Sequence, residues 1–220
     1  MNFDAILFDC DGVLVDSEPI TNGVLRTMLN EAGWPLTDEE CLRIFIGKTV
    51  RSEAARIEAH TGKPFTEEWL QQFYARRNVR LQAELVAIPN AVAAVAAVHE
   101  ALGGRIACAS GADRHKVEMQ LAQVGLAPYF EDRVFSGHEM PQSKPAPDVY
   151  LAAARAVGVA PARCLVVEDT VTGVTAGVAA GATVVGYVPT QGAPSTAEML
   201  RAAGATHILA DMGLLPALLS

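Results

Sequence analysis

The stretch AILFDCDGVLVDS, residues 5–17, joins a short apolar run to three aspartates. Up to Asp9, the run is apolar on both faces, which is typical of a strand buried in a parallel sheet. Asp11 and Asp16 follow closely. Like charges at this spacing repel one another, and carboxylates at the edge of an apolar core are costly to desolvate. The stretch therefore predicts a buried strand followed by aspartates that have a functional role.

Further short runs rich in apolar and β-branched residues follow along the chain, and helical patterns separate them. They are residues 105–110, 133–137, 164–169, 183–188 and 207–210. The chain has 220 residues, of which 50% are hydrophobic, so it can bury a sizeable core. This alternation predicts an α/β fold, a doubly wound parallel sheet with helices on both faces.

The interval 18–88 breaks the alternation, because it carries helix signals only. Pro19 can open a helix that Gly33 closes, and Thr37 with Glu40 forms a capping box. An all-helical segment is therefore inserted after the first strand. The predicted domains are residues 1–17 with 89–220 for the α/β core and residues 18–88 for the helical insert.

The composition narrows the class of function. A net charge of −8 and a pI near 5.1 argue against nucleic acid or an anionic membrane as partner. A local cationic pocket can still bind an anionic substrate. No apolar run reaches the ~18 residues of a membrane span, and no signal peptide is recognisable. The four cysteines form no CxxC pair, which favours reduced, buried thiols in a cytoplasmic protein.

Polar side chains gather after the first four predicted strands, at the carboxyl ends where open parallel sheets bind ligands. They are Asp9 and Asp11, Ser110 and Gly111, Lys144, and Glu168 with Asp169. Several carboxylates in one place need a hard cation, and oxygen ligands suit Mg²⁺. A serine, backbone N–H groups and a lysine can bind phosphate. The set predicts Mg²⁺-assisted phosphoryl transfer, in which Asp9 can be the nucleophile and Asp11 the acid and base.

Four segments, DCDGVLVDS, CASG, SKPAPD and VVEDTVTG, resemble in this order the motifs of the haloacid dehalogenase-like phosphohydrolases. The most similar subgroup comprises the phosphatases and β-phosphoglucomutases that have a helical cap after the first strand. The resemblance covers nearly the whole chain. It implies a HAD-type phosphoric monoester hydrolase whose insert is a cap that closes over the substrate.

The resemblance also implies roles for the acids. Asp9 matches the nucleophile and a metal ligand. Asp11 matches the general acid/base, and its backbone carbonyl also binds Mg²⁺. Glu168 and Asp169 match the acidic pair that holds the metal.

For the substrate, the resemblance implies that Ser110 and the Gly111 amide bind phosphate. Lys144 steadies both the nucleophile and the phosphate. In the insert, Gly47–Lys48 resembles a loop that reaches the leaving group, and Arg77 lies where relatives carry a basic substrate contact. Judged by residue type alone, Lys48 and Arg77 would be ordinary surface charges.

The expected activity is hydrolysis of a small phosphorylated metabolite, such as a sugar phosphate or phosphorylated sugar acid, by a cytoplasmic monomer. A sugar phosphomutase is the alternative. Against it, the chain has Thr21 where the mutases carry a histidine, and the expected cap arginine falls one position late, at Arg51. Asp11 argues against carbon–halogen cleavage, since the dehalogenases lack this second aspartate. A phospho-receiver domain is a more distant alternative, because receivers have no helical insert.

Overall fold

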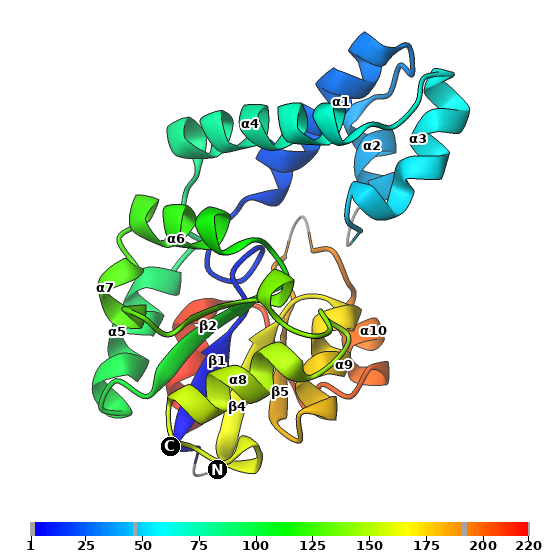
Figure 1. The fold of residues 1–220 in the computed structure, drawn as a ribbon. Coiled ribbons are helices and arrows are strands. Elements are labelled where there is room, and N and C mark those ends of the chain that lie inside the picture. Colours follow the sequence, from blue (N-terminus) through cyan, green and yellow to red (C-terminus); the bar gives the residue numbers. More distant parts are fainter. Residues whose placement is uncertain (1–2, 46–47, 191–192, 220) are drawn as a thin grey trace. The chain divides into compact units, whose positions relative to one another are not determined.

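The computed structural model describes residues 3–45, 48–190 and 193–219. Its strands form one six-stranded sheet in the order β3-β2-β1-β4-β5-β6, and all pairings are parallel (Figure 1). The strands are β1 (Ala5–Phe8), β2 (Ile106–Ser110), β3 (Val134–Ser136), β4 (Cys164–Glu168), β5 (Thr183–Tyr187) and β6 (His207–Leu209). The prediction of a doubly wound parallel sheet is confirmed, and each strand lies within its predicted run.

The first strand lies inside the sheet, between β2 and β4. Phe8 stands opposite Cys108 of β2 and Val167 of β4, so the ends of the three strands are in step. Ser110 and Glu168 are the last residues of β2 and β4. The register therefore brings Asp9, Ser110 and Glu168 to the same edge of the sheet.

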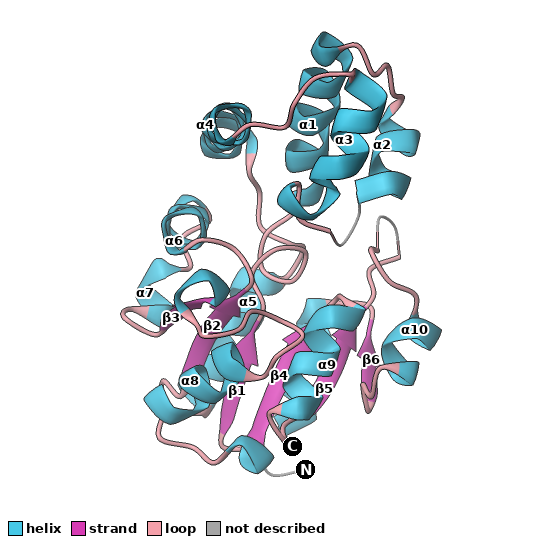
Figure 2. Ribbon diagram, turned by 45° about the vertical axis from the view of Figure 1, so that its right-hand side comes forward, coloured by secondary structure: helices cyan, strands magenta, loops and turns pink. Residues whose placement is uncertain are grey.

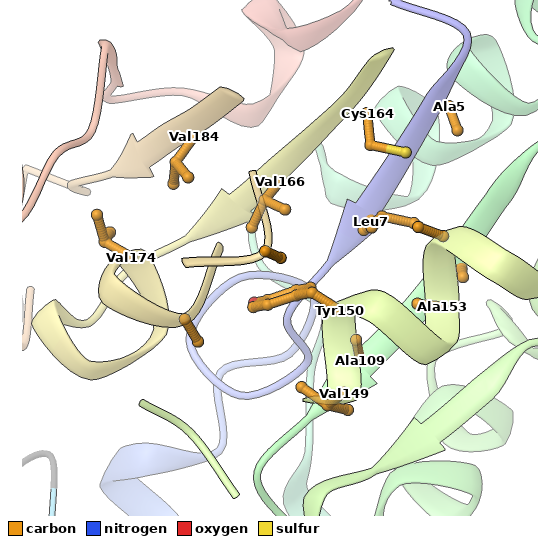
Figure 3. Close-up of a cluster of buried hydrophobic side chains, with 14 of the residues drawn as sticks. Ala5, Leu7, Ala109, Val149, Tyr150, Ala153, Cys164, Val166, Val174 and Val184 are labelled. Atoms are coloured by element: carbon orange, nitrogen blue, oxygen red, sulfur yellow. The ribbon is translucent and has the colours of Figure 1, made fainter. Parts of the chain in front are cut away.

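Helices cover the sheet because its strands are apolar on both sides (Figure 2). The helices of this part of the chain are α5 (Ala91–Ala101), α6 (Arg114–Gln123), α7 (Ala127–Phe130), α8 (Asp148–Ala156), α9 (Val171–Ala179) and α10 (Ala197–Ala202). Short 3₁₀ helices are η2 (Gly137–Glu139), η3 (Pro161–Arg163) and η4 (Met212–Leu219). On one face, α8, α9 and α10 enclose a cluster that includes Leu7, Val166 and Tyr150 (Figure 3). On the other, the ring of Phe8 meets Phe130 of α7 edge-on.

In the described part of the chain between β1 and α5, every regular element is a helix. These helices are α1 (Glu18–Ala32), α2 (Asp38–Phe45), η1 (Arg51–Glu53), α3 (Ala54–Thr61) and α4 (Glu67–Glu84). Gly33 ends α1 with φ of 103°, and Glu40 accepts a hydrogen bond from the Thr37 amide at 2.9 Å, as the sequence predicts. Leu29, Leu70 and other apolar side chains give this segment a core of its own.

The chain divides into two compact units, Met1–Asp16 with Val86–Ser220 and Ser17–Leu85. In the first unit, the chain departs and returns along paired backbone, because the Asp16 amide donates to the Val86 carbonyl at 3.0 Å. Val15 also forms a bridge with Ala87. The helical unit is therefore a continuous insertion whose two ends start from adjacent points.

All four cysteines are buried free thiols. Among the described residues, no helix combines the length and the apolar character needed to cross a bilayer.

Candidate active site

Asp9 lies at the centre of a buried ion-pair network at the carboxyl edge of the sheet. Its amide continues the β1 ladder by donating to Val167 at 3.0 Å, which fixes the backbone of the residue. The Lys144 ammonium lies 2.6 Å from an Asp9 carboxylate oxygen and 2.6 Å from Glu168 Oε1. Only 7% of the Lys144 side chain is exposed. One lysine therefore joins the acids that follow β1 and end β4.

Glu168 accepts further hydrogen bonds from Tyr150, Thr170 and Asp169. The Tyr150 hydroxyl donates to Oε1 at 2.9 Å, and the Thr170 hydroxyl donates to Oε2 at 3.0 Å. The amides of Asp169 and Thr170 also donate to Oε2. The Lys144 ammonium lies 4.7 Å from the centre of the Tyr150 ring. These contacts fix the direction of the Glu168 carboxylate before any ligand binds.

Two glycines allow the acids to approach the backbone. A Cβ on Gly173, in the first turn of α9, would lie 1.7 Å from Glu168 Oε1. A Cβ on Gly12 would lie 2.0 Å from an Asp169 carboxylate oxygen, and Gly12 also has φ of +77°. Real atoms cannot approach so closely, so both positions must lack a side chain.

Burial and charge oppose each other at this network. Burial raises the pKa of Asp9 to about 7, and the nearby charges of Glu168 and Asp11 act in the same direction, against the lowering effect of Lys144. Burial disfavours the charged form of Lys144, but the carboxylates of Asp9 and Glu168 outweigh it and hold the pKa of Lys144 well above its ordinary value. The ammonium is therefore charged at neutral pH, and the site has more acid than base.

The acids fit a small, hard cation. Asp9, Glu168 and Asp169 are buried, and each offers a carboxylate oxygen within 4.8 Å of the others. Carboxylate oxygens in a polar pocket are the donors that Mg²⁺ prefers. A divalent cation among them would also offset the excess of negative charge. The residues present are thus compatible with the predicted metal.

The Asp11 carboxylate pairs with Lys116, whereas the Asp9 carboxylate pairs with Lys144. Lys116 Nζ lies 2.8 Å from both of its oxygens, and Gln120 Nε2 donates to Oδ1 at 2.9 Å. Both residues come from α6. The two neighbouring aspartates are therefore separated, because each has its own lysine.

The predicted phosphate-binding segment follows β2. Ser110 is buried, and its hydroxyl accepts a hydrogen bond from the Ala112 amide at 3.1 Å. The Ser136 hydroxyl donates to the Ala112 carbonyl at 2.6 Å and fixes the turn that contains Gly111. Asp113 caps α6 by accepting from the Lys116 amide. This turn joins the end of β2 directly to the helix that contacts Asp11.

The two expected substrate contacts of the helical unit have different surroundings. Lys48 lies 3.3 Å from Glu53, and its side chain is 41% exposed. Arg77 is only 6% exposed, so its interpretation as a surface charge is wrong. Its guanidinium lies 4.8 Å from the centre of the Tyr74 ring and donates to the Asn78 side chain, which explains its burial. Gly47 falls outside the described residues.

Sequence reasoning missed Lys116, Gln120 and Tyr150, and it gave Thr170, at the end of the fourth strand, no role. A signal for the first two was present, since they are spaced like Val117 and Leu121, four residues apart on a helix. Polar residues that share the buried side of a helix with apolar ones indicate an internal partner. Tyr150 carried no such signal, because an apolar ring with a polar tip is ordinary in a core.

Known proteins that are similar to this chain include hydrolases, and several of these are phosphatases. A family model described as haloacid dehalogenase-like hydrolase matches residues 3–181. The 6-phosphogluconate phosphatase of Escherichia coli K12 is 31% identical over 179 residues, which are 81% of this chain and 79% of that enzyme. Hexitol phosphatase B of the same strain is 30% identical over 178 residues, which are 80% and 79% of the two chains.

Among the solved structures, similarity extends over nearly the whole chain in the following example. It is a HAD family hydrolase from Deinococcus radiodurans R1 with bound phosphate and sodium. It has a TM-score of 0.83 and 33% identity, and the match covers 99% of this chain and 95% of that one.

Proposed function

The chain belongs to the haloacid dehalogenase-like hydrolase family, and on this basis we propose that it is a Mg²⁺-dependent phosphatase. Its substrate is a small sugar phosphate or phosphorylated sugar acid, and its reaction passes through an aspartyl-phosphate on Asp9. The observation that carries the proposal is the pairing of Lys144 with both Asp9 and Glu168 at 2.6 Å, beside Asp169. A buried carboxylate held in this way has a fixed direction, and groups that can bind phosphate surround it.

The reaction takes two steps. In the first, an Asp9 oxygen bonds to phosphorus and the bond from phosphorus to the ester oxygen breaks. The ester oxygen keeps the electron pair and takes the proton of the Asp11 carboxyl group. In the second, the Asp11 carboxylate removes a proton from water, and the water oxygen bonds to phosphorus. The bond from phosphorus to Asp9 then breaks, with its electron pair returning to Asp9.

The other residues bind and orient the phosphate. Lys144 neutralises charge on the phosphate and on Asp9, and the Ser110 hydroxyl and the Gly111 amide donate to phosphate oxygens. Asp9, Glu168, Asp169 and the Asp11 carbonyl would hold Mg²⁺. When bound, the ion supplies positive charge that stabilises the charge of the transferring group.

The substrate class rests on the relatives. Two of them are named for 6-phosphogluconate and for hexitol phosphates, and both are at least 30% identical to this chain. The proposal assigns the choice of leaving group to the helical unit, with Lys48 and Arg77 as candidate contacts. No observation favours the mutase or the receiver alternative.

The test combines substrates with two variants. We expect Mg²⁺-dependent release of phosphate from 6-phosphogluconate or a hexitol phosphate. Asp9→Asn removes the nucleophile, so no covalent adduct should form. Asp11→Asn retains the nucleophile but lacks the acid and base, which contribute roughly 10²–10⁴-fold. With p-nitrophenyl phosphate, whose leaving group needs no proton, mass spectrometry should show the adduct accumulating on Asp9 of this variant.

Asp132→Asn, at an exposed aspartate of the same unit, is the control and should keep the wild-type rate. Near-native turnover of Asp9→Asn, or an adduct on another residue, would contradict the assignment. Transfer of the phosphoryl group to a second sugar hydroxyl instead of water would identify a mutase.

A further inference from the structure

Helix α6 carries two buried polar side chains that both end on Asp11. Lys116 is 6% exposed and Gln120 is fully buried, although lysine and glutamine ordinarily lie on the surface. Burying an ammonium and an amide is costly unless both find partners. Their common partner is the Asp11 carboxylate, with three contacts of 2.8–2.9 Å.

We propose that Lys116 and Gln120 are positioning residues that hold the Asp11 carboxylate in its catalytic orientation. This rests on the proposed function, in which Asp11 moves both protons. Two bonds from different residues reach Oδ1, and a third reaches Oδ2. The carboxylate cannot rotate about its Cβ–Cγ bond without breaking at least one of them.

The positioning pair is itself rigidly supported. The Asp113 side chain caps α6 at the Lys116 amide, 2.9 Å away, so the helix begins at a fixed residue. Gln120 also accepts a weak hydrogen bond from the Cys10 thiol at 3.6 Å, and Cys10 directly precedes Asp11 in the chain. Val117 and Leu121 anchor the same side of α6 in the core. The support therefore reaches Asp11 from the helix and from its own loop.

The two residues contribute in different ways. Lys116 supplies charge and two of the contacts, whereas Gln120 supplies one contact and no charge. Placement of a reacting group matters steeply, since a displacement of about 1 Å can cost roughly 10²-fold in rate. We expect the loss of Lys116 to be larger than the loss of Gln120.

The experiment compares Lys116→Met and Gln120→Met with Gln123→Met, an exposed glutamine of the same helix. With a sugar phosphate, kcat should fall roughly 10–100-fold for Lys116→Met and several-fold for Gln120→Met. Both losses should be smaller than or at most equal to the loss of the acid and base itself, which is roughly 10²–10⁴-fold. KM should change little. Gln123→Met should retain the wild-type values.

A second readout separates positioning from a general loss of folded enzyme. With p-nitrophenyl phosphate the first step needs no proton, so only the hydrolysis of the phospho-enzyme should slow. In stopped-flow mixing, the Lys116→Met and Gln120→Met variants should then release a burst that approaches about one nitrophenolate per active site. A slow steady-state release of nitrophenolate should follow the burst. If Lys116→Met does not fold, Gln120→Met carries the test.

An equal fall in kcat for both substrates with no change in the burst would overturn the inference. In that case the pair merely stabilises the fold. This outcome differs from failure of the proposed function, in which the wild type and Asp11→Asn would show no adduct on Asp9 at all.

Discussion

Gly173 and Glu168 show how one residue can depend on the lack of a side chain at another. The Glu168 carboxylate lies over the first turn of α9, where it also accepts from the amides of Asp169 and Thr170. A helix start is a favourable place for an anion, because its amides point toward it. Only glycine at position 173 leaves room for this arrangement.

Gly173→Ala should therefore damage the site with little effect on the helix. The new Cβ would meet Glu168 Oε1 at 1.7 Å, so the carboxylate must move and its contact with Lys144 must break. A displaced catalytic group costs roughly 10²-fold, and we expect kcat to fall by about this factor. Steady-state kinetics with a sugar phosphate measures it. Thr175→Ala, at an exposed position of α9, should keep the native rate, and an unchanged rate for Gly173→Ala would count against the rigid placement of Glu168.

The site residues that the sequence predicts lie at the ends of strands, whereas some of those that it misses lie on a helix. Asp9 follows a strand, and Ser110 and Glu168 end two others. The carboxyl ends of parallel strands share one edge of the sheet, so the grouping of these residues follows from topology. Lys116 and Gln120 lie on a helix, and their contact with Asp11 depends on which side of α6 faces the site. A single sequence gives the period of a helix but not its rotation about its own axis.

At the scale of elements, the central strands β1, β2 and β4 were predictable because each is a short apolar run buried on both sides. The ends of α1 were also predictable, from Pro19 at its start and Gly33 after its end. The burial of Arg77 was not, because a guanidinium that stacks on Tyr74 one turn earlier has the sequence pattern of an exposed charge. Local chemistry therefore fixes where elements begin and end, whereas tertiary contacts decide which long side chains are covered.

Helix α1 offers two glycines with opposite expectations. Gly23 lies within the helix, and nothing lies within 4 Å of a Cβ built there, so Gly23→Ala should stabilise the helical unit by roughly 0.5–1 kcal/mol. Gly33 has φ of +103°, so Gly33→Ala should destabilise it by roughly 1–2 kcal/mol. Both tryptophans of the chain, Trp34 and Trp69, lie in this unit, so urea unfolding followed by tryptophan fluorescence reports on it.

The decisive result is that the two variants should change the stability of the helical unit in opposite directions. Each variant adds one methyl group, Gly23→Ala within α1 and Gly33→Ala directly after its end. A shared effect of side-chain volume therefore cannot produce opposite changes in stability. A destabilising Gly23→Ala would show that the position is crowded in solution, and a neutral Gly33→Ala would show that α1 ends elsewhere.

For the molecule as a whole, the buried acids should couple metal binding to stability. A ligand that binds only the folded chain stabilises it by about 2.7 kcal/mol at a hundredfold excess over its Kd. This corresponds to a rise in Tm of roughly 5–10 °C for a protein of this size. We expect Mg²⁺ to produce such a rise, measured by thermal unfolding, and EDTA to remove both the rise and the activity.

Asp169→Asn should lose most of this response, whereas Asp132→Asn, at an exposed position, should retain it. Full activity after exhaustive chelation, with no change in Tm on adding Mg²⁺, would refute the metal site.

The paired backbone at Asp16 and Val86 has a consequence for how such a protein can diversify. Because the chain leaves and rejoins the α/β unit at adjacent residues, everything between them can be exchanged without shifting the register of a strand. A different continuous piece of coding sequence, of another length, could be accommodated at the same junction. Recombination at one locus could therefore give the same hydrolytic chemistry a new range of substrates. For engineering, chimaeras joined at these two residues offer a direct way to alter specificity.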